Sequence, residues 1–374
     1  MFRQAIFCDF DLFGGTRTYL LELLKLYKEK NYQIFLFLPK KVDADILIEF
    51  QRLNIIVKKN PFKFLEEIKL FNFFPISLIL NFLEALFAQI KIQPDGVTIS
   101  TGTLTRFLGI PLFFSHSLLI FHTYPQCSNK QFLSSSVIKA FIKKNRRILT
   151  VSHYSKNMIE QCWNPKKKHD YIHFIHNFSI FEDFYTESSN IDTNKPIKIL
   201  TIGHVEKYKN PNFWINIALQ ISQISQLNCE FLWIGDGTLL ESCRNLLKEH
   251  KTDRIKFIGY RKDVLPFLKD CDIYFQPSII ESHGISVVDA MTLGIPCVVT
   301  NVGGLPESVV NNQTGFVVDL DNPQEMKDKI LLLINNKNLR ESMGKSGRER
   351  YRDFFSKKKW KSEMNKVHEE IFGV

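Results

Sequence analysis

The sequence predicts an α/β protein made of two doubly wound domains, each with a parallel sheet. Short apolar runs rich in β-branched and aromatic residues alternate with longer helical patterns, and this alternation occurs in two series. A polar stretch without periodicity, roughly 179–195, separates the two series and is typical of a linker. A chain of 374 residues is also longer than one ordinary core supports. We therefore expect an N-terminal domain over 1–180 and a C-terminal domain over 195–350.

The first series opens with a strand, a helix and a second strand. These are QAIFCDF (4–10), GGTRTYLLELLKLYKEKN (14–31) and YQIFLFLP (32–39), with two glycines at the first turn. Three later apolar runs are expected to join the same sheet, at 96–101, 117–123 and 146–152. Strands that alternate with helices imply right-handed crossovers and hence parallel pairing.

The second series has the same character and is longer. It predicts strands at 197–203, 229–235, 254–259, 272–278, 295–300 and 315–319, and helices at 210–224, 237–250 and 285–294. The final segment, 348–372, has a helical pattern and no strand after it. Two such domains in tandem would place a cleft between them.

Composition limits the classes of function. The net charge of +10 suits anionic partners such as phosphorylated substrates or an anionic membrane surface. Basic clusters stand at 142–147, 164–169 and 356–360, although exposed lysines in contact with water explain any single cluster equally well. No zinc-finger spacing, RNA-binding motif or basic zipper accompanies them, so nucleic acid is not an expected partner. The seven cysteines include no C-x-x-C pair, which favours a reducing cytoplasm over a zinc site or disulfide framework.

One apolar stretch, 70–90, is long enough to raise the question of whether it spans a membrane. Asn72, Pro75, Asn81 and Glu84 interrupt it, whereas a spanning helix has about 20 residues with few or no charges. A buried or surface-lying helix is the prediction. Contact with a membrane interface stays open.

Two acidic residues flank a strand-to-helix turn in PSIIESHGISVVDAM. Glu281 lies in the loop after the strand, and Asp289 lies about one turn inside the helix that follows Gly284. In an open α/β sheet such loops border the ligand crevice. The alternative is that Glu281 caps the helix and that the Asp289 side chain faces water, because acids near helix N-termini are common.

Three further turns are of a type that binds phosphate. GHVEKYKNP places Lys209 between a strand and a helix, IGDGTLL places Gly235 and Gly237 one unit later, and NVGGLPESV follows another strand. None of them is a Walker motif or a complete G-x-G-x-x-G, and each alone is explained by an ordinary turn. Their repetition at one edge of a sheet favours a phosphate site.

The complete set of motifs resembles the retaining glycosyltransferases of family 4, which have the GT-B architecture of two Rossmann-like domains facing a central cleft. The acid–x7–acid signature of this family corresponds to Glu281 through Asp289, and its G-R-x4-K loop runs from Gly203 to Lys209. In the N-terminal half, GGTRTYLLELL, IFHT, VSHYSKNMI and IHNFS correspond to further marks of the family. The resemblance covers nearly the whole chain.

The resemblance implies roles for individual residues. Catalytic roles would fall to Glu281, Lys209 and His122, although a structural histidine is the alternative for His122. Donor-binding roles would fall to Gly15, Arg17, Gly203, His204, Gly235, Gly237, Tyr260, Arg261, Ser282, His283, Gly284, Ile285 and Asp289. It also implies that a C-terminal helix of about 355–374 returns to the N-terminal domain.

Three positions depart from the family pattern. His204 stands where Arg is common, which leaves more of the pyrophosphate charge to Lys209 and Arg17. Asp289 is one methylene shorter than the usual Glu, and His283 replaces a common Phe.

The implied reaction is transfer of a sugar from a nucleotide diphosphate donor to an acceptor hydroxyl, with retention at the anomeric carbon and without a metal or other cofactor. The acceptor would be a glycan or a lipid-linked glycan of bacterial cell-surface synthesis. A related GT-B epimerase or phosphorylase is the alternative enzyme, although no lysine motif for pyridoxal phosphate is apparent. A non-enzymatic binder of anions or membranes is the alternative from another class, since the net charge is +10.

Overall fold

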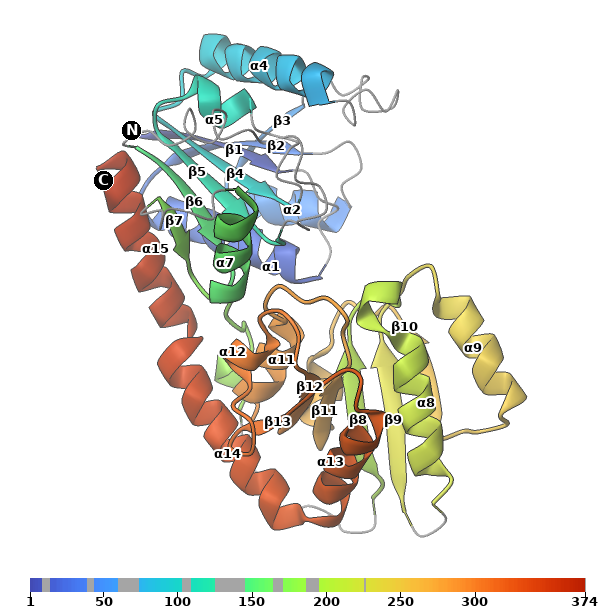
Figure 1. The fold of residues 1–374 in the computed structure, drawn as a ribbon. Coiled ribbons are helices and arrows are strands. Elements are labelled where there is room, and N and C mark those ends of the chain that lie inside the picture. Colours follow the sequence, from blue (N-terminus) through green and yellow to red (C-terminus); the bar gives the residue numbers. More distant parts are fainter. Residues whose placement is uncertain are drawn as a thin grey trace. The chain divides into compact units, whose positions relative to one another are not determined.

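The structure is a computed structural model of the full chain. It describes residues 1–8, 14–38, 44–59, 74–102, 109–124, 145–163, 171–185, 195–224 and 227–373. The chain divides into two compact units, which we call the N-terminal unit (Met1–His176 with Lys361–Val374) and the C-terminal unit (Asn177–Trp360). Figure 1 shows a sheet flanked by helices in each unit.

The N-terminal unit contains a seven-stranded sheet in the order β3-β2-β1-β4-β5-β6-β7. Each described strand pairs in parallel with its neighbour, and Ile6 of the first strand lies between Leu36 and Thr98. The strands are β1 (Arg3–Cys8), β2 (Gln33–Leu38), β3 (Ile56–Lys59), β4 (Gly96–Thr101), β5 (Ser117–Phe121), β6 (Arg146–Thr150) and β7 (Ile172–Phe174). Apolar runs such as GVTIST are buried along their whole length, as expected for a sheet covered on both faces.

The C-terminal unit contains a six-stranded parallel sheet in the order β10-β9-β8-β11-β12-β13. Its strands are β8 (Ile197–Ile202), β9 (Cys229–Ile234), β10 (Ile255–Gly259), β11 (Ile273–Gln276), β12 (Cys297–Thr300) and β13 (Gly315–Val318). In both units the first three strands run outward in one direction and the fourth pairs with the first on its other side. This order defines the Rossmann-like doubly wound sheet, so the predicted fold class is confirmed.

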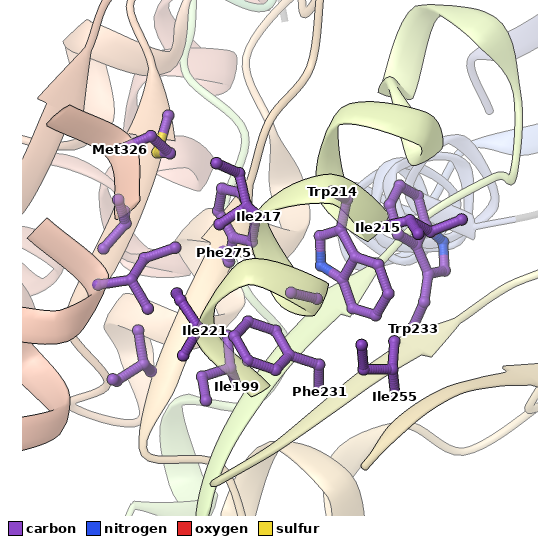
Figure 2. Packing of buried hydrophobic residues seen from close by; sticks show 14 of the residues in the cluster. Ile199, Trp214, Ile215, Ile217, Ile221, Phe231, Trp233, Ile255, Phe275 and Met326 are labelled. Carbon is purple, nitrogen blue, oxygen red and sulfur yellow. The ribbon is translucent and has the colours of Figure 1, made fainter. Parts of the chain in front are cut away.

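Aromatic packing on one face of the second sheet fixes the helix that follows β8. Trp214 of α8 (Pro211–Ser222) meets Trp233 of β9 edge to face, with ring centroids 5.4 Å apart, and also contacts Phe231 (Figure 2). Both tryptophans are fully buried. Burial of such rings contributes a few kcal/mol each, about 25 cal/mol per Å² of apolar surface. The start of α8, and with it the loop between β8 and α8, is therefore anchored by the core.

The predicted C-terminal helix is two helices, α14 (Lys337–Phe354) and α15 (Lys357–Phe372). From Lys361 onward α15 belongs to the N-terminal unit. There the buried His368 shares a hydrogen bond of 2.7 Å with the Tyr27 hydroxyl, and Phe372 packs beside Gly96. The return of the C-terminal helix to the first domain is thus observed in these contacts.

Several described elements have no counterpart among the predicted ones. They include α2 (Ala44–Arg52), β3, α7 (His153–Trp163), β7 and α13 (Pro323–Asn335). The units divide between His176 and Asn177, and the first residues of the predicted linker hold a 3₁₀ turn, η4 (Glu182–Phe184). Of the linker, 186–194 lie outside the described residues, as do the basic cluster 164–169 and residues 142–144.

The cysteines depart in part from the sequence expectation. Cys162 of α7 is disulfide-bonded, and its partner lies outside the described residues. Cys229, Cys243, Cys271 and Cys297 carry free thiols. The sequence led us to expect no disulfide framework, and the bond of Cys162 departs from that expectation, because C-x-x-C spacing detects only cysteines close in sequence.

Candidate functional site

The predicted donor residues gather at one edge of the C-terminal sheet. Because its strands are parallel, the loops that follow β8, β9, β10, β11 and β12 all leave from the same edge. The first and fourth strands of the series, β8 and β11, are neighbours, so the crossovers diverge between them. Ligands of doubly wound sheets bind at this switch point. The loops 203–210 and 277–284 therefore flank the position where a ligand is expected.

Lys209 and Glu281 meet across this switch point. Lys209 ends the short 3₁₀ turn η5 (Lys207–Lys209) after β8, and its ammonium forms an ion pair with the Glu281 carboxylate from the loop after β11. Their side chains are only 11% and 14% exposed. A buried opposite-charge pair is strongly coupled, because removing one member leaves the other charge uncompensated.

Backbone contacts hold the two loops together beneath this pair. The amide of Ile279 donates to the carbonyl of Tyr208 over 2.8 Å, and the ammonium of Lys209 lies 5.8 Å from the centre of the Tyr208 ring. Ser278 donates its hydroxyl to Glu281 Oε2 over 3.4 Å, while Gln276 Nε2 donates to the Ser278 oxygen over 2.8 Å. The geometry of the pair therefore depends on residues that pattern reading did not single out.

Two glycines allow close approach at this edge. A Cβ on Gly235 would lie 1.9 Å from the carbonyl oxygen of Gly203, and a Cβ on Gly303 would lie 1.7 Å from that of Glu281. Gly303 also has a φ of +57°, a backbone conformation that residues other than glycine rarely adopt. The Trp233 indole donates to the Gly203 carbonyl over 2.9 Å, which connects the aromatic core directly to the loop that carries Lys209.

His204 lies at the solvent side of the same loop. Its Nδ1 and the Tyr208 hydroxyl share a hydrogen bond of 2.9 Å. Partial burial, and then the nearby Lys209 charge, lower the pKa of His204 below its usual 6.5. Burial and the charges of Glu281 and Glu206 raise the pKa of Tyr208 to about 12. His204 is therefore a neutral hydrogen-bonding group near pH 7, rather than a second cation.

Asp289 lies on α11 (Ile285–Thr292), whose N-cap is Gly284 in the left-handed region with a φ of +85°. Burial raises the pKa of its carboxyl to about 7, while a hydrogen bond from Ser179 opposes that shift. At neutral pH this acid is consequently divided between the charged and the protonated form. The sequence does not indicate this raised pKa, because it shows neither the burial of Asp289 nor its hydrogen bond with Ser179.

The remaining C-terminal candidates occupy different surroundings. The His283 ring is buried edge to face against Phe355, with centroids 5.5 Å apart. Ser282 and Ile285 are half-buried around Gly284, and Gly237 lies against the Val205 backbone. Tyr260 is half-exposed after β10, and Arg261 donates to its carbonyl over 2.8 Å. Because β10 is two strands from β8, these last two residues lie farther along the edge than Lys209.

The N-terminal candidates lie at the carboxyl edge of the other sheet. His122 follows β5, and its Nε2 shares a hydrogen bond of 2.9 Å with Ser100 at the end of β4. Its ring meets Tyr19 edge to face at 4.9 Å, and burial lowers its pKa to about 3. Arg17 of α1 (Gly14–Glu29), near Gly15, forms an ion pair of 3.2 Å with Glu49 of α2. His122 is thus a neutral group, and Arg17 already has a carboxylate partner.

Within the described part of the chain, no group of three or more His, Cys, Asp or Glu residues is arranged to hold a metal ion.

Comparisons with known proteins agree on the class. Residues 182–350 match the model of the family described as Glycosyl transferases group 1. An uncharacterized glycosyltransferase of Methanocaldococcus jannaschii is 32% identical over 157 residues, which are 41% of this chain and 44% of that protein. The N-acetyl-alpha-D-glucosaminyl L-malate synthase of Bacillus anthracis is 25% identical over 248 residues, 63% of each chain. The match thus spans less than two thirds of the length of these two relatives.

Solved structures extend the likeness to nearly the full chain. A glycosyltransferase of Rickettsia africae ESF-5 has a TM-score of 0.77 at 18% identity, covering 99% of this chain and 98% of that one. The Anabaena protein HepE, solved in complex with UDP and glucose, has a TM-score of 0.74 at 18% identity, covering 97% and 98%. The chain therefore has the fold of the GT-B glycosyltransferases, as its motifs indicated. Within it, the similarity to the glycosyl transferases group 1 family extends over residues 182–350.

Proposed function

We propose that the chain is a retaining glycosyltransferase of family 4 that moves a sugar from a nucleoside diphosphate to an acceptor hydroxyl. The observation that carries this proposal is the Lys209–Glu281 pair at the switch point of the C-terminal sheet, inside the group 1 domain. The pair places a cation suited to phosphate beside a carboxylate suited to sugar hydroxyls.

Donor binding would exchange the partners of this pair. The Lys209 ammonium turns from Glu281 to the diphosphate, and the Glu281 carboxylate then accepts hydrogen bonds from the donor sugar. Asp289, one turn inside α11, receives the ribose hydroxyls, and the backbone amides around Gly284 add positive potential at the helix start. His204, being neutral, contributes a hydrogen bond rather than charge.

The transfer step then requires no protein nucleophile, metal or other cofactor. The bond between the anomeric carbon and the diphosphate oxygen breaks, and its electron pair leaves with the diphosphate. The acceptor oxygen bonds to the same face of the sugar, and its proton passes to the departing phosphate oxygen. Lys209 and the loop amides stabilise the negative charge that develops on the diphosphate. Electrostatic stabilisation of this kind is usually the largest single contribution to catalysis. His122, with a pKa of about 3, acts in this account as a neutral hydrogen-bonding group.

We further propose a cytoplasmic enzyme of bacterial cell-surface glycan synthesis with a glycan or lipid-linked acceptor. Relatives named for capsular polysaccharide biosynthesis and for transfer to sugar-diphosphoundecaprenol support this acceptor class. The UDP-glucose complex of HepE supports a nucleotide-sugar donor.

The test is a thermal-shift screen of nucleotide-sugars, followed by an assay of nucleoside diphosphate release. Stabilisation by a ligand grows with its concentration over Kd, so the preferred donor should raise the melting temperature most. Release of nucleoside diphosphate from that donor by the wild type, and not by Glu281→Gln, is the expected result. Stabilisation without any release would identify a binding protein and reject the proposal.

A further inference from the structure

Helix α4 (Phe74–Lys91) has large apolar side chains on the face that points to solvent. Ile79, Phe82, Leu83, Leu86 and Ile90 are between 37% and 64% exposed. Their spacing of three, four, seven and eleven positions from the first residue places them on one face of the helix. Of the exposed residues between 79 and 90, the one polar residue is Gln89.

The opposite face of α4 buries Leu80 together with smaller and more polar residues. Ala85 and Ala88 belong to the core cluster of the N-terminal unit, and Asn81 and Glu84 are buried. An ordinary surface helix has the reverse arrangement, with its apolar residues inward and its charges outward. Small residues let α4 lie close to its own domain, while most of its large apolar residues between 79 and 90 are exposed.

The patch extends beyond α4 and is the largest of its kind among the described residues. Phe113 of α5 (Gly109–Phe113) is 37% exposed, and its ring lies 6.5 Å from that of Phe82. Elsewhere, exposed large apolar side chains lie no more than one to an element. Figure 1 shows α4 as the outermost helix beside α5 in the N-terminal unit. A contiguous patch of this kind marks a surface that binds something, whereas scattered apolar residues do not.

Charge identifies the class of partner. Of the 49 basic and 39 acidic residues, 26 and 16 belong to the N-terminal unit, which leaves 23 of each in the C-terminal unit. The whole net charge of +10 therefore belongs to the unit that carries α4. An apolar face on a strongly basic domain is complementary to an anionic bilayer, whose surface attracts basic residues and whose interior takes up apolar side chains.

We propose that the exposed apolar face of α4 inserts into the interface of an anionic lipid bilayer and docks the N-terminal unit there. The helix lies in the membrane surface rather than across it. No helix in the described ranges is long and apolar enough to span a bilayer. This docking does not depend on the proposed transferase activity, since it requires only α4 and the charge of its unit.

The experiment is vesicle sedimentation of the full chain, with phosphatidylcholine vesicles that contain or lack phosphatidylglycerol, at low and high salt. We expect binding to the anionic vesicles at low salt and weaker binding as salt rises, since salt screens exposed charges. Replacing three patch residues (Ile79→Ser, Phe82→Ser, Leu86→Ser) should weaken vesicle binding about tenfold or more, because most of the apolar contact is lost.

A matched control removes the same number of exposed apolar residues outside the patch, with Ile48→Ser, Ile224→Ser and Leu332→Ser. These residues lie on different stretches of chain, and this variant should bind vesicles like the wild type. Phe82→Trp keeps an aromatic residue on α4, and its added fluorescence should shift to the blue with anionic vesicles. The fluorescence measurement on Phe82→Trp does not depend on whether the triple variant folds.

Two outcomes would overturn the proposal. One is equal vesicle binding by the wild type and the triple variant, with no change in the fluorescence of Phe82→Trp. The other is a wild-type dimer in light scattering that ignores vesicles and becomes a monomer in the triple variant. That result would make the patch an interface between copies of this chain. Retained stabilisation by UDP, if the wild type shows it, would confirm that the triple variant is folded.

Discussion

At the scale of single residues, the proposed function depends on Lys209 and Glu281 of the C-terminal unit. Each is the ion-pair partner of the other in the structure, with little exposure to solvent. Under the proposed function, donor binding has to separate them and offer both a better partner. The energetic cost of separation is offset only by a ligand with negative charge on one side and hydroxyls on the other. A nucleotide-sugar has this combination.

Glu281→Gln should lower turnover about 100-fold or more, a loss of about 2.7 kcal/mol of transition-state stabilisation, while the fold is kept. The amide has the shape of the carboxylate but not the charge that strengthens its hydrogen bonds to sugar hydroxyls. Steady-state kinetics on the preferred donor measure this. Glu206→Gln is the control, since Glu206 lies in the neighbouring loop that carries Lys209 and accepts hydrogen bonds from Thr238 instead. Turnover of Glu281→Gln within about threefold of the wild type would remove Glu281 from the site.

Lys209→Ala should weaken binding of a nucleoside diphosphate much more than binding of the nucleoside, because the ammonium is assigned to the phosphates alone. Titration calorimetry with UDP and with uridine gives both affinities. Lys207→Ala provides the control, since Lys207 is an exposed lysine of the same 3₁₀ turn. An equal loss for both ligands would indicate a disturbed fold, and the assignment would fail.

Asp289 should make stability depend on pH. Its pKa is about 7 in the folded protein against 3.8 as the ordinary value, so folding takes up a proton between these limits. The contribution is complete below about pH 4 and is lost as pH rises through about 7, with an upper limit of about 4 kcal/mol. Urea denaturation across this range should show a steeper decline for the wild type than for Asp289→Asn. Identical pH profiles would contradict the raised pKa.

His204 should not make donor binding depend on pH near 6.5. An imidazole of ordinary pKa would strengthen donor binding as pH falls through 6.5. Burial and Lys209 lower that pKa, so any gain from a charged His204 lies below this window.

At the scale of elements, the contact between α15 and β4 is tight enough to test. A Cβ on Gly96 would lie 2.6 Å from the Phe372 ring and 2.7 Å from Gln4 Oε1. Gly96→Ala should therefore destabilise the N-terminal unit by about 1–3 kcal/mol, the usual range for overpacking. Denaturant unfolding measures the loss, and nucleotide affinity should not change. An unaltered unfolding midpoint would show that α15 does not pack here.

Elements with strong periodicity were predictable, and those fixed by tertiary contact were not. The strands at 96–101 and 229–235 are short runs rich in β-branched or aromatic residues, so composition identifies them. β7 has three residues and β3 has four, and such short strands exist only because a neighbour pairs with them. The break between α14 and α15 falls within a continuous helical pattern, which periodicity cannot divide.

The same distinction holds for the candidate site. Motif spacing brings Lys209 and Glu281 to one edge, since both follow parallel strands. It does not predict that the two side chains form an ion pair, because they are 72 residues apart in the sequence. It also does not predict that the Ser278 hydroxyl donates to Glu281 three residues later, because this contact depends on how the loop folds. Perturbed pKa values, such as that of Asp289, depend on burial and are invisible in the sequence.

At the scale of the whole molecule, charge and chemistry are divided between the units. The N-terminal unit carries the net positive charge and the apolar face of α4, whereas the C-terminal unit is electrically balanced and holds the Lys209–Glu281 pair. Under the two proposals above, the N-terminal unit docks on a membrane surface and the C-terminal unit binds the donor. This division predicts that salt affects vesicle binding strongly and affects nucleotide binding less.

The most direct test of the central claim is proton NMR of donor turnover, with water in place of the unknown acceptor. The donor is the nucleotide-sugar that stabilises the chain most, and spectra are recorded before the released sugar mutarotates. We predict that nucleoside diphosphate is released and that the first free sugar has the anomeric configuration of the donor. First appearance of the opposite anomer, or no release of nucleoside diphosphate with any donor that binds, would contradict retaining transfer at this site.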